Sequence, residues 1–210
     1  MAGHGAVAGV ILAGGGGVRM GRVVKGRLRV GGRSLMERLL AVYRPLFHEI
    51  VISTRAPGDW AGLGLPLAPD RLPGRSSLTG IHGGLSAVRA SHAFVAACDA
   101  PFLQAGLVRT LLAHVTPEVD IVVPLKADGY MEPLCAVYSR RCLGPIEDQL
   151  RRGSFKIIEF FDRMRVVQVP EAELRAGDPD LASFINVNTP AELRAAIRRE
   201  RAAVRAAASV

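Results

Sequence analysis

The sequence lacks several features that would assign it to a membrane or secreted class of protein. No apolar run reaches the ~20 residues that a membrane-spanning helix requires, so we expect no membrane partner. The three cysteines, Cys98, Cys135 and Cys142, are odd in number and have no C-x-x-C spacing, which argues against a disulfide framework and against a zinc site. The first residues lead almost directly into a strand-like run, so we expect no signal peptide and a cytoplasmic protein.

Two well-known glycine loops of nucleotide-binding proteins are also missing. The P-loop pattern G-x-x-x-x-G-K fails because Arg22, and not lysine, follows Gly21. The dinucleotide fingerprint G-x-G-x-x-G fails in every register. The acidic residue expected after its second strand is absent too, because that run leads into Ser53-Thr54-Arg55. The sequence therefore excludes both of these nucleotide-binding classes.

A different glycine-rich loop is present, between a strand-like run that ends at Leu12 and the cation Lys25. The loop begins Ala13-Gly14-Gly15 and carries a second cation, Arg19. Because glycines let a backbone turn sharply, successive amides can form a concave site for an anion, and the two cations add charge where phosphates would lie. The pattern predicts binding of a nucleoside triphosphate. The alternative, an ordinary strand-to-helix turn, rarely needs four glycines and two cations.

Length and charge narrow the possible architecture and partners. At 210 residues, 49% of them hydrophobic, the chain fits a single domain over residues 1–210. The net charge is +8, and residues 190–210 supply three of those charges through five arginines and two glutamates. These arginines lie on an expected C-terminal helix, about 190–206, without interleaved aromatics, so we interpret them as a solvated face and expect no nucleic-acid partner. Positive charge elsewhere suits small polyanionic ligands.

Strand-like and helical runs alternate along the chain, which predicts an α/β domain with a mostly parallel twisted sheet flanked by helices. Capping boxes at Ser34–Glu37 and Thr189–Glu192, the second with Pro190 at the first helical position, predict two helix starts, and Gly153 predicts a helix end. A further helix is expected over 80–90. The expected strands cover 6–12, 49–52, 93–97, 120–124, 132–137, 166–169 and 184–187, with a short strand exit at 67–70.

Asp99 directly follows an expected central strand, in the segment Cys98-Asp99-Ala100-Pro101. In doubly wound sheets, ligands bind beyond the carboxyl ends of the strands. Mg²⁺ prefers oxygen ligands and binds through one or two carboxylates plus substrate phosphates. Asp99 is therefore the leading candidate for a Mg²⁺ ligand, and Asp70 is the second. The alternative role for Asp99 is to cap the helix that follows.

Five segments in the same order along nearly the whole chain resemble the MobA family, the molybdenum cofactor guanylyltransferases. The first is L-A-G-G at 12–15 with R-M-G at 19–21 and Lys25, and the second is L-T-G-I-H-G-G-L at 78–85. The third is C-D-A-P at 98–101, and the fourth is G-Y-M-E-P-L-C-A-V-Y at 129–138. The fifth is F-I-N-V-N-T-P at 184–190.

The resemblance implies a Rossmann-like nucleotidyltransferase fold and a Mg²⁺-dependent transfer of GMP from GTP to molybdopterin, with release of pyrophosphate. It also implies molybdoenzymes or other cofactor-biosynthesis proteins as partners. It assigns catalytic roles to Lys25, Asp99 and Arg19. It assigns substrate contacts to Leu12, Ala13, Gly14, Gly15, Lys25, Ser53, Asp70, Gly80, Asp99, Asn186 and Asn188, with the two asparagines on the pterin side.

Turn chemistry ahead of the last helix is the alternative for both asparagines. His82, which lies among small apolar residues, favours a packing or capping role.

The chain departs from the family pattern at three places. Val24 replaces an aspartate before the loop lysine, Ser76-Ser77 replaces Gly-Pro, and Ser53 stands where the family often has asparagine. Three alternatives stay open: a cytidylyltransferase acting on the same pterin, a sugar-phosphate nucleotidyltransferase, and a nucleotide-binding protein without turnover.

Overall fold

The computed structural model describes residues 7–14, 23–70, 72 and 74–208. Gly15 and Arg19, two of the predicted site residues, lie outside the described residues.

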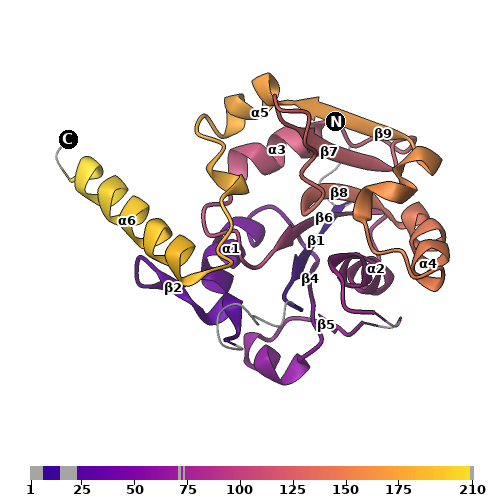
Figure 1. Ribbon diagram of the computed structural model, residues 1–210, viewed down its shortest axis with the longest axis horizontal. Helices are drawn as coiled ribbons and strands as arrows, with labels where there is room; N and C mark the ends of the chain where they lie inside the picture. Colours follow the sequence, from indigo (N-terminus) through magenta and orange to yellow (C-terminus); the bar gives the residue numbers. More distant parts are fainter. Residues whose placement is uncertain (1–6, 15–22, 71, 73, 209–210) are drawn as a thin grey trace.

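A seven-stranded sheet in the order β5-β4-β1-β6-β8-β7-β9 forms the centre of the described structure (Figure 1). Every neighbouring pair of strands is parallel except the two that involve β8, which is antiparallel to both β6 and β7. The predicted α/β architecture with a mostly parallel sheet is thus confirmed. The strands are β1 (Val7–Leu12), β4 (Ile50–Ser53), β5 (Leu67–Ala68), β6 (His92–Ala97), β7 (Ile121–Leu125), β8 (Cys135–Ser139) and β9 (Val166–Pro170).

Helices cover both faces of this sheet (Figure 1). One face packs against α1 (Leu35–Tyr43), α3 (Ala105–Ala113) and α5 (Glu171–Gly177), and the other against α2 (Ser77–Ala87) and α4 (Leu143–Arg151). A small hairpin, β2 (Arg29–Val30) with β3 (Arg33–Ser34), precedes α1. The remaining helices of the described residues are α6 (Pro190–Ala207) and the short 3-10 helices η3 (Lys25–Arg27), η4 (Pro57–Asp59), η5 (Ala61–Leu63), η6 (Arg140–Cys142), η7 (Ile157–Arg163) and η8 (Ala182–Phe184).

The central strands are buried on both faces, which explains their unbroken apolar sequences. In β1, Ala8, Val10 and Leu12 join the hydrophobic cluster under α2 and α4, while Ile11 joins the cluster under α1 and α3. Gly84 lets α2 approach this strand closely, because a Cβ built there would lie 2.3 Å from a methyl carbon of Val10. A parallel sheet covered on both faces requires this composition, since neither side meets water.

The predicted helix ends are present. The Ser34 hydroxyl accepts a hydrogen bond from the Glu37 backbone at 3.2 Å, while the Glu37 carboxylate accepts one from the Ser34 backbone at 2.6 Å. Thr189 and Glu192 form the same reciprocal box, with Pro190 at the first helical position. Gly153 follows α4 with φ of +73°, a conformation that favours glycine.

Three elements differ from prediction. The strand expected over 132–137 is β8, which begins at Cys135 and ends at Ser139. The helix expected over 80–90 begins at Ser77 and ends at Ala87, because Ser76 and Thr79 form a capping box upstream. The strand expected over 184–187 is wrong: Ala182–Phe184 is a 3-10 helix, and the residues after it are irregular. The alternating apolar residues there pack individually into the core and do not pair with any described strand. Val187, for example, is fully buried in the cluster that includes residues of α6.

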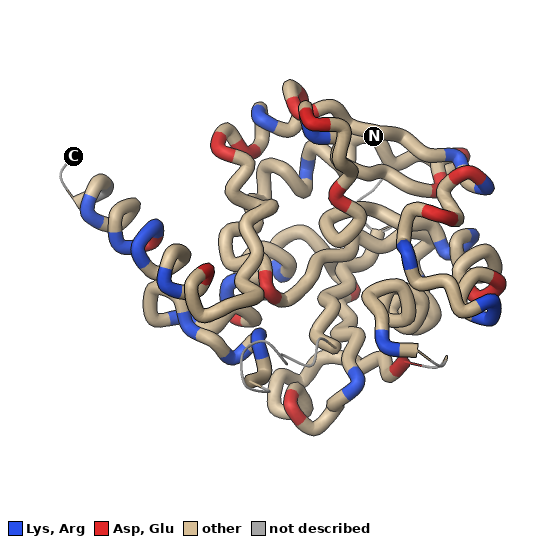
Figure 2. Tube along the Cα trace, viewed as in Figure 1, with Lys and Arg blue, Asp and Glu red and all other residues tan. Residues whose placement is uncertain are grey.

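Helix α6 extends away from the sheet, and basic residues are distributed along it (Figures 1 and 2). Arg194, Arg198 and Arg201 are exposed, as a solvated face predicts. The same helix also faces the domain through Ala196, which is buried in a cluster with Val30.

Asp120, just before β7, holds the ends of several elements together. It is 5% exposed, and its carboxylate accepts hydrogen bonds from the Arg165 backbone at 2.9 Å and from the Arg141 guanidinium. Burial alone would raise the pKa of Asp120, but the hydrogen bonds and the nearby guanidinium groups outweigh burial and hold this pKa below its ordinary value.

We therefore predict that Asp120→Ala lowers the free energy of unfolding by about 3 kcal/mol at neutral pH. A carboxyl whose pKa is lower in the folded state stabilises the fold above its unfolded pKa, and that stabilisation disappears as the pH falls through the folded pKa. Urea unfolding of both proteins at neutral pH and at about pH 3 measures the effect. The stability difference should shrink in acid. An equal difference at both pH values would contradict the ionic role.

Candidate active site

The carboxyl ends of three parallel strands meet at one edge of the sheet. Leu12 pairs with Ser53 of β4 on one side and with Ala97 of β6 on the other. The next residues continue the contact: the Ala13 N–H donates to the Ser53 carbonyl at 2.7 Å, and the Cys98 N–H donates to the Leu12 carbonyl at 2.9 Å. The chain leaves β1 for a strand on one side and returns on the other, which is where doubly wound sheets bind ligands.

Lys25, Asp99 and Asn188 form a polar cluster at this edge. The Lys25 ammonium donates to the Asp99 carboxylate at 2.9 Å and to the Asn188 side-chain oxygen at 2.6 Å. The side chains of Lys25 and Asp99 are only 15% and 16% exposed. These residues come from η3, from the loop after β6 and from the segment before α6. The fold thus brings into direct contact three site residues that the sequence analysis placed in separate segments.

Asp99 does not cap a helix. The next helix, α3, begins at Ala105, and Gln104 occupies its N-cap position. The Asp99 backbone carbonyl instead accepts a hydrogen bond from the Val187 N–H at 2.8 Å. The capping alternative is therefore wrong, and the carboxylate is directed to Lys25.

The turn that carries Lys25 is fixed by packing. A Cβ on Gly26 would lie 2.5 Å from the ring of Trp60, which is 4% exposed, so only glycine allows this approach. Val24, the departure from the family pattern, is partly buried and packs against the main hydrophobic cluster. An apolar side chain at this position therefore supports the turn.

Ser53 and Gly80 join α2 to the end of β4. The Ser53 hydroxyl donates to the Gly80 carbonyl at 2.8 Å, and Ser53 is 1% exposed. A Cβ on Gly80 would lie 3.4 Å from both Leu12 and Ser53 side chains. Leu12, Ala13, Ser53 and Gly80 are thus neighbours, and their contacts with a nucleotide stay a prediction.

Asp70 forms a second ion pair at this edge of the sheet, with Arg55. The Arg55 guanidinium lies 3.6 Å from the Asp70 carboxylate, and the Arg55 side chain passes 3.5 Å from the place a Cβ on Gly14 would occupy. Partial burial raises the pKa of Asp70, and Arg55 opposes that shift. Asp70 and Asp99 therefore interact with different cations.

Arg55 was not among the predicted site residues. Its signal in the sequence was a cation two positions beyond the last residue of a buried strand, at the edge where ligands bind.

The two asparagines before α6 differ in their surroundings. Val187 between them is buried, Asn186 is exposed, and Asn188 is partly buried and contacts Lys25. The Asn188 backbone N–H donates to Glu192 at 2.6 Å, so this residue takes part in the helix start as well as in the cluster.

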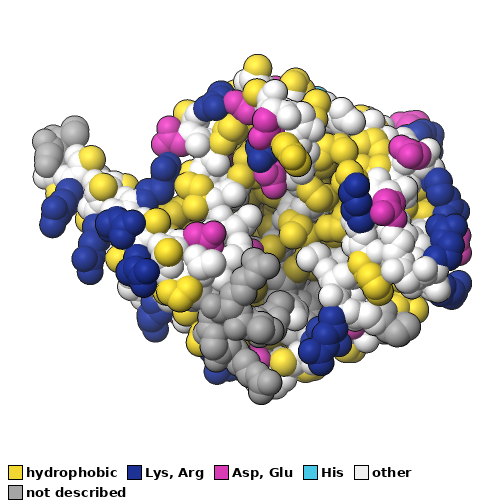
Figure 3. All heavy atoms as spheres, viewed as in Figure 1, with side chains coloured by type: hydrophobic (Ala, Val, Ile, Leu, Met, Phe, Trp, Pro, Cys, Tyr) yellow, Lys and Arg dark blue, Asp and Glu magenta, His cyan; other side chains and the backbone are white. Residues whose placement is uncertain are grey.

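Hydrophobic side chains gather in a hollow near the centre of the face shown in Figure 3. The hairpin between β7 and β8 lies at the same edge of the sheet as the polar cluster, because β7 runs parallel to β1. This hairpin carries Tyr130, which is 71% exposed, with the Lys126 ammonium 5.9 Å from its ring centre. A flat aromatic surface thus lies near the edge that holds the charges.

The cysteines take no visible part in this site. All three are free and buried. Burial, reinforced by the neighbouring Asp99, raises the pKa of the Cys98 thiol to about 12, so it stays protonated at neutral pH. Within the described residues, no group of three or more His, Cys, Asp or Glu side chains could hold a metal. None of the described helices is long and apolar enough to cross a membrane.

Comparison with known proteins gives the family. The family model described as MobA-like NTP transferase domain matches residues 9–167. The chain is 42% identical to the molybdenum cofactor guanylyltransferase of Desulfosudis oleivorans, over 91% of this chain and 94% of that protein. It is 38% identical to a probable molybdenum cofactor guanylyltransferase of Pelotomaculum thermopropionicum, over 88% and 89% of the two chains.

A solved structure agrees with these sequence relatives. The molybdopterin-guanine dinucleotide biosynthesis protein A of Archaeoglobus fulgidus superposes with a TM-score of 0.77 at 30% identity, over 91% of this chain and 97% of that one. The chain belongs to the MobA-like NTP transferase family and is a nucleotidyltransferase.

Proposed function

We propose that this protein transfers GMP from GTP to molybdopterin and releases pyrophosphate. The observation that carries the proposal is the contact of Lys25 with Asp99 and Asn188 at the ends of β1 and β6. The 42% identity to a molybdenum cofactor guanylyltransferase supports the choice of substrates.

The cluster supplies what nucleotidyl transfer requires. The reaction breaks the bond between the α- and β-phosphates while the acceptor phosphate attacks the α-phosphorus, so negative charge gathers on the phosphate oxygens. Lys25 would hold these oxygens by a charged hydrogen bond, and the backbone after Leu12 would approach the nucleotide. No protein nucleophile is needed, which agrees with buried, protonated thiols.

Asp99 fits a magnesium ligand. Its carboxylate already accepts a hydrogen bond from one cation, the Lys25 ammonium at 2.9 Å, and 16% of the side chain is exposed. Mg²⁺ prefers such oxygen donors and combines one or two carboxylates with substrate phosphates. When bound, the ion would offset charge on the phosphates.

The acceptor would occupy the side of the site formed by the segment before α6 and the β7–β8 hairpin. Asn186 and Asn188 offer amide groups to the polar edge of a pterin, and Tyr130 offers a flat exposed ring for stacking.

The proposal predicts that GTP with Mg²⁺ is the productive donor. Pyrophosphate release should be measured with each of the four nucleoside triphosphates, with and without molybdopterin. Release should depend on the pterin and be fastest with GTP. Faster pyrophosphate release with CTP than with GTP would make the protein a cytidylyltransferase. Ser53, which stands where the family often has asparagine, would then be the first residue to explain the different choice of base. If the protein binds nucleotide tightly but releases no pyrophosphate in any mixture, it is a nucleotide-binding protein without turnover.

A further inference from the structure

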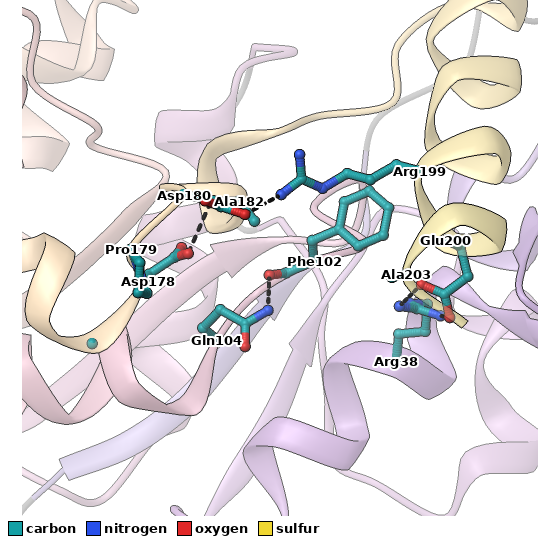
Figure 4. A pocket seen from close by; sticks show the side chains of 11 residues that line it. Arg38, Phe102, Gln104, Asp178, Pro179, Asp180, Ala182, Arg199, Glu200 and Ala203 are labelled. Carbon is teal, nitrogen blue, oxygen red and sulfur yellow. Dashed lines mark hydrogen bonds and ion pairs between the residues drawn. The ribbon is translucent and has the colours of Figure 1, made fainter. Parts of the chain in front are cut away.

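One arginine outside the polar cluster connects the three segments that form it. The Arg38 side chain, on α1, donates to the Pro101 carbonyl at 2.8 Å and to the Val30 carbonyl at 3.2 Å. Its two terminal nitrogens also donate to the Glu200 carboxylate at 2.8 and 2.9 Å. Figure 4 shows this paired contact between Arg38 and Glu200.

Each partner of Arg38 lies on a segment that carries one member of the cluster. Pro101 lies two residues beyond Asp99 on the same loop. Val30 lies in the β2–β3 hairpin, which directly follows the turn of Lys25. Glu200 lies on α6, the helix preceded by Asn188. A shift of the guanidinium would therefore be transmitted to all three segments.

Aromatic packing strengthens this connection. The ring of Phe102, on the Asp99 loop, lies between Arg38 and Arg199, whose guanidinium carbons are 5.4 and 5.8 Å from its centre (Figure 4). Arg199 is held in turn by Asp180 at 3.0 Å. A cation that lies over the face of an aromatic ring is attracted to that ring. Helix α6 thus holds the Asp99 loop through a second contact besides Glu200.

The chemistry of this contact requires a guanidinium. The Arg38 and Glu200 side chains are only 18% and 21% exposed, and a planar fork can bind a carboxylate with two nitrogens while a third reaches a carbonyl. A lysine ammonium keeps the charge but cannot reproduce this geometry.

We propose that Arg38 is a positioning residue for nucleotidyl transfer: it fixes the loop of Asp99 against the turn of Lys25 and the start of α6, and so sets the site for metal and phosphates. The inference rests on the proposed function. The positions of Asp99 and Lys25 depend on this alignment. Loosening it should therefore reduce the stabilisation of the transition state more than it reduces the affinity for the nucleotide. Misplacement of reacting groups by about 1 Å can reduce rates by about 100-fold.

The test compares Arg38→Lys and Glu200→Gln with the matched control Arg175→Lys. Arg175 also donates to a carboxylate, Glu171 at 2.8 Å, and to a carbonyl, Pro179 at 2.6 Å, but it lies on α5. We expect Arg38→Lys to lower kcat by about tenfold or more and to raise the Mg²⁺ concentration for half activation, with KM for GTP within about threefold of wild type. Glu200→Gln should change the same two quantities less, and Arg175→Lys should change neither.

The melting temperature, kcat and Mg²⁺ dependence together separate a positioning role of Arg38 from a purely structural one. A lower melting temperature with unchanged kcat and Mg²⁺ dependence would make Arg38 a purely structural residue and overturn the inference. If Arg38→Lys does not fold, Glu200→Gln decides alone, since it leaves Arg38 in place. An inactive wild-type protein with all four nucleotides would refute the proposed function instead, so the two failures are distinguishable.

Discussion

Asp99→Asn should lower the rate of pyrophosphate release by two or more orders of magnitude while reducing nucleotide binding far less. Asparagine keeps the size of the side chain but removes the negative charge that would hold Mg²⁺ against the phosphates. Charge stabilisation by such a metal supplies several kcal/mol in the transition state, and each 1.36 kcal/mol is about tenfold in rate. Rates should be measured at saturating Mg²⁺, with circular dichroism to verify folding.

The neighbouring residue provides the control for this substitution. Cys98→Ser changes a buried thiol whose pKa is raised to about 12, so it should keep most of the activity. The structure removes the main ambiguity, because Asp99 caps no helix and a loss of activity cannot be ascribed to a lost cap. If folded Asp99→Asn turns over at nearly the wild-type rate, the metal ligand lies elsewhere, and Asp70 is next to be tested.

Lys25→Ala should weaken triphosphate binding by about ten- to a hundredfold and slow turnover, while the protein stays folded. A hydrogen bond between charged groups contributes about 1.5–3 kcal/mol, whereas an exposed lysine contributes under about 1 kcal/mol. The Lys25 side chain is 15% exposed, so water replaces it poorly. Nucleotide titration calorimetry and steady-state rates measure both effects.

Lys156→Ala is the matched control, because Lys156 is an exposed lysine of the same chain. It should bind GTP as the wild type does. Equal affinities for wild type and Lys25→Ala would mean that Lys25 does not contact phosphate. The proposed site would then lack its principal phosphate-binding cation.

Features set by neighbouring residues were predictable from the sequence. The capping boxes at Ser34 and Thr189 depend on residues three positions apart, and the central strands depend on an apolar run that any buried parallel strand requires. The location of Asp99 at a strand end was predictable too, because the apolar run directly before it identifies the strand. The strand expected over 184–187 was wrong because its apolar residues satisfy packing without pairing.

Features set by distant contacts could not be predicted. Arg38 meets Pro101 and Glu200 across 63 and 162 positions, and nothing around it in the sequence distinguishes it from a solvated helix residue. The antiparallel direction of β8 is hidden for a similar reason, since a buried strand has the same composition in either direction. Arg55 and Asp70 became partners only through the pairing of β4 with β5.

The fate of the α-phosphate of GTP distinguishes guanylyl transfer from every other reaction of the nucleotide. The protein should be incubated with molybdopterin, Mg²⁺ and GTP labelled at the α-phosphate, and the products separated by chromatography and identified by mass. The label should move to a pterin dinucleotide containing one GMP, with one unlabelled pyrophosphate for each product. Label that stays on guanine nucleotides, while wild-type protein binds both substrates, would contradict the proposed function.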